Sequence, residues 1–148
     1  MAILHAIKSN ILFEKFGDKG LSLMAKIIER RELPQGTPLF VAGLPGESMF
    51  VVESGEVALE LRVGDRIVPI ATLGPGQHFG QLSVLKPGPR LVGAATTTDS
   101  VVLEINRKAL LKLHSIKPQT SLKFMLAIVE NYAAMTRELA PSLLKMMS

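Results

Sequence analysis

The spacing of apolar residues changes twice along the chain and divides it into three parts. Between residues 1 and 35, apolar side chains recur at three- and four-residue intervals, as on one face of a helix. From 36 to 105 they fall in short runs that end at glycines, the pattern of strands and turns. From 106 to 148 the helical spacing returns. The pattern predicts a single α+β domain, in which a β-roll is flanked by N-terminal helices and a long C-terminal helix.

The N-terminal part is predicted to form two helices. The first covers residues 2–16 and ends before Gly17. Asp18 is the predicted N-cap of the second helix, whose apolar stripe extends to Ile28. A charged run at 29–32 ends this helix, and Pro34 stops it.

The central part is predicted to be a roll of short strands joined by glycine turns. Gly64 and Asp65 mark a hairpin turn, and Gly74 and Gly76 mark another turn. Strands are expected at 39–41, 49–53, 57–61, 66–71, 92–97 and 101–105.

The C-terminal part is predicted to hold a short helix at 106–113 and a long helix from Pro118 to residue 140, where Pro141 ends it. The long helix carries two apolar stripes, although one would suffice to pack it on the roll. The second stripe predicts a two-fold contact between two copies of the chain, and hence a homodimer. Its members are Leu122, Leu126, Val129 and Ala133.

The charge is unevenly distributed along the chain. The net charge is +4, with −1 on residues 1–105 and +5 on residues 106–148. The basic residues of the second part are spread singly along predicted helices, which favours a solvated helix face over a nucleic-acid-binding stripe.

The residue content argues against catalysis and against a metal site. The chain has no cysteine, and its three histidines fall on different elements without the spacing of metal ligands. Neither a nucleophile elbow nor a flanking pair of carboxylates is evident. We therefore expect neither an enzyme nor a bound metal or cofactor. With no run of 18 apolar residues and no leader-like N-terminus, we expect a cytoplasmic protein that does not span a membrane.

The segment 79–92 carries the strongest chemical signal. It begins with a glycine turn at Phe79-Gly80, continues through a short apolar run, breaks at Pro87-Gly88-Pro89 and then places Arg90. Backbone amides in a tight turn beside one arginine form a nest for an anion, and a guanidinium suits a phosphate because it can bond two oxygens at once. The alternative is an ordinary surface loop with a solvated arginine.

This segment resembles the phosphate-binding cassette of cyclic nucleotide-binding domains, the family of the catabolite activator protein and of kinase regulatory subunits. Residues 79–85 and 89–92 match the two halves of that cassette at the family's separation, without a gap. The resemblance implies a jelly-roll and a cyclic mononucleotide ligand, cAMP or cGMP. It also implies ligand contacts at Phe79, Gly80, Gln81, Leu82, Ser83, Arg90 and Leu91, and a pocket wall at Leu59, Leu61 and Ile70.

Two positions depart from the family pattern. Gln81 stands where the family has a glutamate that accepts a bond from the ribose hydroxyl, and Leu91 stands where it has a small or hydroxyl residue. A neutral acceptor and a lost donor predict an affinity about 10- to 100-fold weaker than the family pattern gives. Alternatively, Leu91 fills the pocket.

The resemblance leaves two functions open. The first is a stand-alone cyclic nucleotide sensor that signals through an unidentified protein effector or through its own dimer. The second is a ligand-free domain that serves as a protein-interaction scaffold. The DNA-binding members of the family carry a helix-turn-helix domain after the long helix. Only residues 141–148 follow it here, so we expect no nucleic-acid partner.

Overall fold

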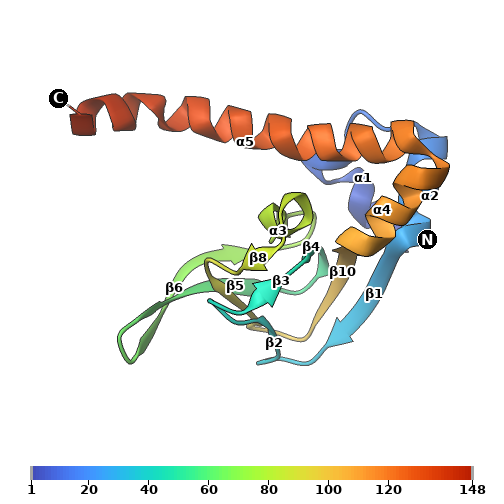
Figure 1. Ribbon diagram of the computed structural model, residues 1–148. Helices are drawn as coiled ribbons and strands as arrows, with labels where there is room; N and C mark the ends of the chain where they lie inside the picture. Colours follow the sequence, from blue (N-terminus) through green and yellow to red (C-terminus); the bar gives the residue numbers. More distant parts are fainter. Residues whose placement is uncertain (1, 148) are drawn as a thin grey trace.

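In the computed structural model, which describes residues 2–147, two antiparallel sheets form a roll beneath a layer of helices (Figure 1). One sheet has the strand order β1-β10-β4-β7, and the other β2-β9-β5-β6. A third, two-stranded sheet pairs β3 with β8. The predicted jelly-roll flanked by helices is confirmed.

The elements follow one another closely. The helices are α1 (Ala2–Lys8), the 3₁₀ helix η1 (Ile11–Phe13), α2 (Asp18–Ile27), α3 (Leu82–Leu85), α4 (Arg107–Ile116) and α5 (Pro118–Met147). The strands are β1 (Ile28–Leu33), β2 (Pro38–Phe40), β3 (Pro45–Gly46), β4 (Ser48–Ser54), β5 (Val57–Val63), β6 (Arg66–Leu73), β7 (His78–Phe79), β8 (Gly88–Pro89), β9 (Gly93–Thr96) and β10 (Ser100–Asn106).

Strand β4 separates two hydrophobic cores, because alternate side chains of a strand point to opposite faces. Phe50 and Val52 belong to the core inside the roll. Met49 and Val51 belong to the core between the roll and the helices. With both faces covered, residues 48–52 are all buried, which explains the continuous apolar run in the sequence.

Helix α5 is fixed to the roll and to the N-terminal segment by its first half. Phe124 and Ile128 are fully buried, and the ring of Phe124 lies 5.2 Å from that of Phe13. Further along, the helix projects away from the rest of the chain (Figure 1), and residues 141–147 are exposed. The predicted stripe at Leu122, Leu126, Val129 and Ala133 is exposed as well.

The prediction of a helix through Ile28 and of a first strand after residue 36 was wrong. Helix α2 ends at Ile27, and Ile28–Leu33 forms an edge strand paired with β10. The charged run belongs to this strand because its arginines find cross-strand partners: Arg30 pairs with Glu53 at 2.9 Å, and Arg31 with Glu104 at 3.0 Å. Charged side chains also protect a sheet edge from unwanted pairing.

The helix boundaries near Asn10, Asp18 and Pro141 also differ from the prediction. The first helix breaks at Asn10, whose side chain caps η1 by accepting from the amide of Leu12. Gly17 occupies the N-cap of α2 and Asp18 is its first residue, where a carboxylate favours the helix dipole. Helix α5 continues through Pro141. The carbonyl of Arg137, which loses its intrahelical donor there, lies on an exposed stretch where water can reach it.

Candidate ligand-binding site

The turn after β7 holds a glycine that no other residue could replace without strain. Gly80 has a φ angle of +79°, in the left-handed region that favours glycine. A Cβ at this position would lie 2.9 Å from Nη1 of Arg90 and 3.3 Å from the carbonyl oxygen of Ser48. Phe79 anchors the turn from inside the roll, 3% exposed, with its ring stacked 5.4 Å from that of Phe50. The positive φ angle and the closeness of Arg90 and Ser48 therefore both require glycine at this position.

Arg90 is a buried cation, only 8% exposed. Its Nη1 donates to the carbonyl of Gly80 at 3.2 Å, and its Nη2 donates to the carbonyl of Ser48 at 2.7 Å. The guanidinium carbon lies 4.1 Å from the centre of the Phe40 ring. Strands β3 and β8 bring Gly46 so close that a Cβ there would overlap Nε of Arg90. Backbone and ring thus hold this side chain in one place.

Within residues 2–147 no carboxylate is in direct contact with the guanidinium of Arg90. Its Nε is buried and makes no hydrogen bond within residues 2–147. Burial lowers the pKa of Arg90, and the more distant carboxylate of Glu104 acts in the opposite direction. Glu104 itself accepts hydrogen bonds from Arg31 and from the hydroxyl of Ser48. A buried cation held by neutral carbonyls is costly, and an anion beside it would lower that cost.

A cavity of about 270 Å³ lies against Arg90 and brings together nearly all of the predicted ligand contacts. Gly80, Gln81, Leu82, Ser83, Arg90 and Leu91 line it, as does Leu59 from the predicted wall. Phe79 does not line it, because its side chain is in the core. Leu61 and Ile70 do not line it either, since they lie on the projecting β5–β6 hairpin and are 40% and 52% exposed.

Phe40 and Tyr132 also line the cavity, and the sequence interpretation did not name them. Pro89 and Val92, from the matched cassette half, line it as well. Tyr132 reaches it from α5, and burial raises the pKa of this tyrosine. It is the chain's single tyrosine, which makes it a candidate ligand contact. The sequence alone could not place it at the cavity, because its position depends on how α5 packs against the roll.

Leu91 lies at the rim of this cavity. It is 74% exposed, so in this structure it leaves the cavity open instead of filling it. Leu82, also at the rim, is 47% exposed. The interpretation in which Leu91 blocks the pocket is therefore not what the structure shows.

A larger cavity, of about 500 Å³, lies elsewhere, between the N-terminal segment and α5. Arg90, the buried cation, lines the smaller cavity and not the larger one. Within residues 2–147 no three His, Cys, Asp or Glu side chains are grouped as metal ligands. The described helices include none that is long and apolar enough to cross a membrane.

His78 links the cassette to the N-terminal segment. Both amide hydrogens of Asn10 are donated, one to the carbonyl of Gly76 and one to Nδ1 of His78, each at 2.9 Å. The oxygen of Asn10 accepts from Leu12, which fixes the amide orientation and makes Nδ1 an acceptor. Burial lowers the pKa of His78, while a hydrogen bond with Asn131 of α5 opposes that shift. The neutral form of the imidazole is therefore favoured in the folded protein.

This arrangement predicts a stability that depends on pH. Because the unfolded chain binds a proton more readily than the folded one, the contribution of His78 is complete above about pH 6.5 and is lost as the pH falls below that value. Denaturant unfolding should show a smaller decrease in stability from pH 7 to about 5 for His78→Gln than for the parent. The exposed His5 provides the control: His5→Gln should follow the parent. Parallel curves for His78→Gln and the parent would contradict the assignment.

A known protein family matches the region that contains these residues. The cyclic nucleotide-binding domain family matches residues 30–116, more than half of the chain, and this region includes both Gly80 and Arg90. The chain belongs to this family. Over 108 residues the domain is 33% identical to the cyclic AMP receptor protein of Thermus thermophilus, covering 72% of this chain and 50% of that protein. It thus spans about half the length of that relative.

Two further relatives agree with this assignment. A cAMP-dependent protein kinase regulatory subunit of Eremothecium gossypii is 30% identical over 102 residues, covering 69% of this chain and 21% of the relative. The N-terminal domain of a transcriptional regulator from Streptomyces coelicolor superposes with a TM-score of 0.81 at 24% identity, covering 90% of this chain and 94% of that one. The latter likeness shows the fold. Both curated relatives are named as receptor or regulatory proteins.

Proposed function

We propose that this domain is a regulatory module that binds a cyclic mononucleotide, cAMP or cGMP, in the cavity beside Arg90. The observation that carries the proposal is the buried guanidinium of Arg90, which has no carboxylate partner within residues 2–147 and lies beside a glycine turn that lines a cavity of about 270 Å³. The names of the cyclic AMP receptor protein and of the kinase regulatory subunit support the choice of ligand.

In the proposed complex each part of the ligand meets a different part of the cavity. The cyclic phosphate lies against Arg90 and the amides of the Gly80–Ser83 turn, and gives the buried cation its counter-charge. Gln81 accepts from the ribose hydroxyl through its amide oxygen. The base lies against the apolar walls at Phe40, Leu59 and Val92. Tyr132 of α5 provides an aromatic ring on which the base can stack.

Binding at this site offers a route to signalling, because Tyr132 belongs to α5. A ligand that contacts both the cassette and α5 favours one position of the helix relative to the roll. The exposed stripe on the same helix then transmits the change, either to a second copy of the chain or to an unidentified protein effector. The function is regulatory and needs no chemical step. Calorimetric titration with cAMP and with cGMP tests the proposal.

The dimer is proposed on the exposed stripe of α5. Leu122, Leu126 and Val129 are 53%, 48% and 49% exposed in the single chain, which leaves a continuous apolar face uncovered. Val129→Asp should therefore shift the mass in light scattering from dimer towards monomer. Leu111→Asp, at an apolar position on α4 that is 45% exposed, is the matched control and should leave the mass unchanged. A parent that is already monomeric would contradict the proposed dimer.

A further inference from the structure

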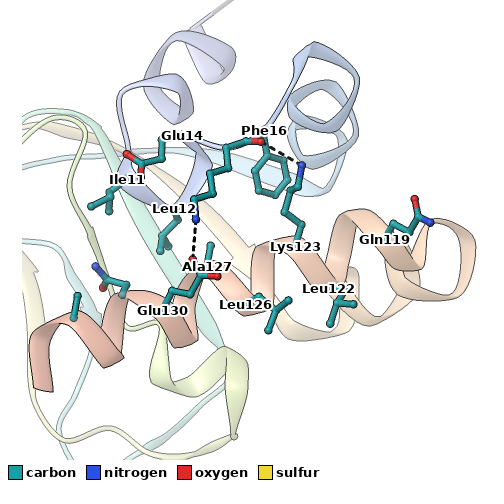
Figure 2. Close-up of a pocket in the computed structure, with 13 residues that line it drawn as sticks. Ile11, Leu12, Glu14, Phe16, Gln119, Leu122, Lys123, Leu126, Ala127 and Glu130 are labelled. Atoms are coloured by element: carbon teal, nitrogen blue, oxygen red, sulfur yellow. Dashed lines mark hydrogen bonds and ion pairs between the residues drawn. The ribbon is translucent and has the colours of Figure 1, made fainter. Parts of the chain in front are cut away.

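A groove separates the N-terminal segment from α5 and is distinct from the cyclic nucleotide cavity. Figure 2 shows Ile11, Leu12 and Phe16 on one side and Leu122, Leu126 and Ala127 on the other. Its volume of about 500 Å³ lies within the range of small-molecule sites in proteins. Apolar side chains dominate both walls, so the groove suits a ligand with an apolar body.

Part of this apolar surface is left in contact with water. Leu12 and Phe16 are buried at 2% and 9% exposure, whereas Ile11, Leu122 and Leu126 are 56%, 53% and 48% exposed. An apolar ligand lying between the two walls would remove these three side chains from water, which is the main source of affinity in such sites.

The two ends of the groove differ in charge. Lys123 stands at the Phe16 end (Figure 2); its Nζ donates to the carbonyl of Lys15 at 3.2 Å and lies 5.4 Å from the centre of the Phe16 ring. Among the described residues Lys123 makes no ion pair. Glu14 stands at the Ile11 end, and Glu130 is neutralised by Lys15 at 3.2 Å. The Phe16 end therefore offers an ammonium group to an anion.

We propose that this groove binds a small amphiphile with an alkyl chain and one carboxylate head, with the head at Lys123. The proposal goes beyond the cyclic nucleotide site, with which the groove shares no lining residue. The groove does share Leu122 and Leu126 with the stripe of the proposed dimer, so the amphiphile and a second copy of the chain exclude one another at these two residues. A long helix is a less suitable occupant. The Lys15–Glu130 pair and the Lys123–Lys15 contact both join the two walls, and so limit the width of an occupant. A helix with side chains is about 10–12 Å wide. An alkyl chain is much narrower.

The test uses dodecanoate, below its critical micelle concentration, as the probe in calorimetry on the parent protein. We expect saturable binding, weakened about tenfold in Lys123→Gln because a charge-assisted contact is lost. Lys112→Gln, an exposed lysine of α4 outside the groove, is the matched control and should bind like the parent. Dodecanol, which has the same chain without the charge, should bind more weakly than dodecanoate.

A second variant shows where the probe binds. Ala134 lines the groove and is exposed, so Ala134→Phe should fold normally and should reduce binding by filling space. Arg90→Ala should leave dodecanoate binding intact, which separates this site from the proposed nucleotide site. Either of two results would overturn the proposal: an absence of saturable binding in the parent, or equal binding by Ala134→Phe. If binding is absent in the parent and appears only after Val129→Asp separates two copies, the occupant of the groove is a second chain.

Discussion

Replacing Arg90 with alanine is expected to weaken cAMP binding by roughly 10- to 100-fold, because a charge-assisted hydrogen bond to the ligand contributes about 1.5–3 kcal/mol. The guanidinium is already fixed by Gly80, Ser48 and Phe40, so little side-chain freedom remains to be lost on binding. Arg90→Lys should fall between the parent and the alanine variant, because an ammonium keeps the charge but loses the planar fork. Calorimetry on the three proteins measures the effect.

Arg62→Ala is the matched control for this series. Arg62 is an exposed arginine on β5, outside the cavity, and its replacement should leave cAMP affinity unchanged. Denaturant unfolding of each variant shows whether it remains folded, since Arg90 also fills space beside Gly46. Equal affinities for the parent and for a folded Arg90→Ala would show that the cation does not contact the ligand.

Restoring the family pattern with Gln81→Glu and Leu91→Thr together should strengthen cAMP binding by about 10-fold or more. A carboxylate is a stronger acceptor for the ribose hydroxyl than an amide, and threonine adds a hydroxyl that can donate to the phosphate. Leu91 is 74% exposed, so its replacement should not disturb the core. Both single variants and the double variant are measured by the same titration.

Gln35→Glu is the control for the added charge, because Gln35 is exposed and lies outside the cavity. It should bind like the parent. A double variant that binds while the parent does not at millimolar cAMP would identify the natural domain as the ligand-free scaffold. If neither protein binds, the cassette is not a nucleotide site.

Much of the fold was predictable because local sequence and tertiary structure agree along most of the chain. Val57, Leu59 and Leu61 alternate with less apolar residues, and Gly64-Asp65 forms the turn between β5 and β6 as expected. The prediction failed where a long-range partner decided the structure. The charged run marks the end of α2 to within one residue, but nothing local predicts the strand that follows; residues 28–33 form β1 because they pair with β10.

The candidate site was predictable only in part. Gly80 and Arg90 are close in sequence, and the spacing of the two cassette halves brought both to attention. The carbonyl of Ser48, which accepts a hydrogen bond from Arg90, is a backbone group, so the residue types along the chain do not predict its role. Phe40 and Tyr132 reach the cavity from distant parts of the chain, so their roles depend on how β2 and α5 pack.

Calorimetric titration of the unmodified domain with cAMP, followed by cGMP, tests the central proposal most directly. The buried guanidinium and the open cavity predict saturable binding of at least one of the two nucleotides, at an affinity at least about 10-fold below that of the Gln81→Glu, Leu91→Thr variant. An absence of heat from binding for both nucleotides at millimolar concentration, in a protein shown to be folded, would contradict the proposal that this domain is a cyclic nucleotide sensor.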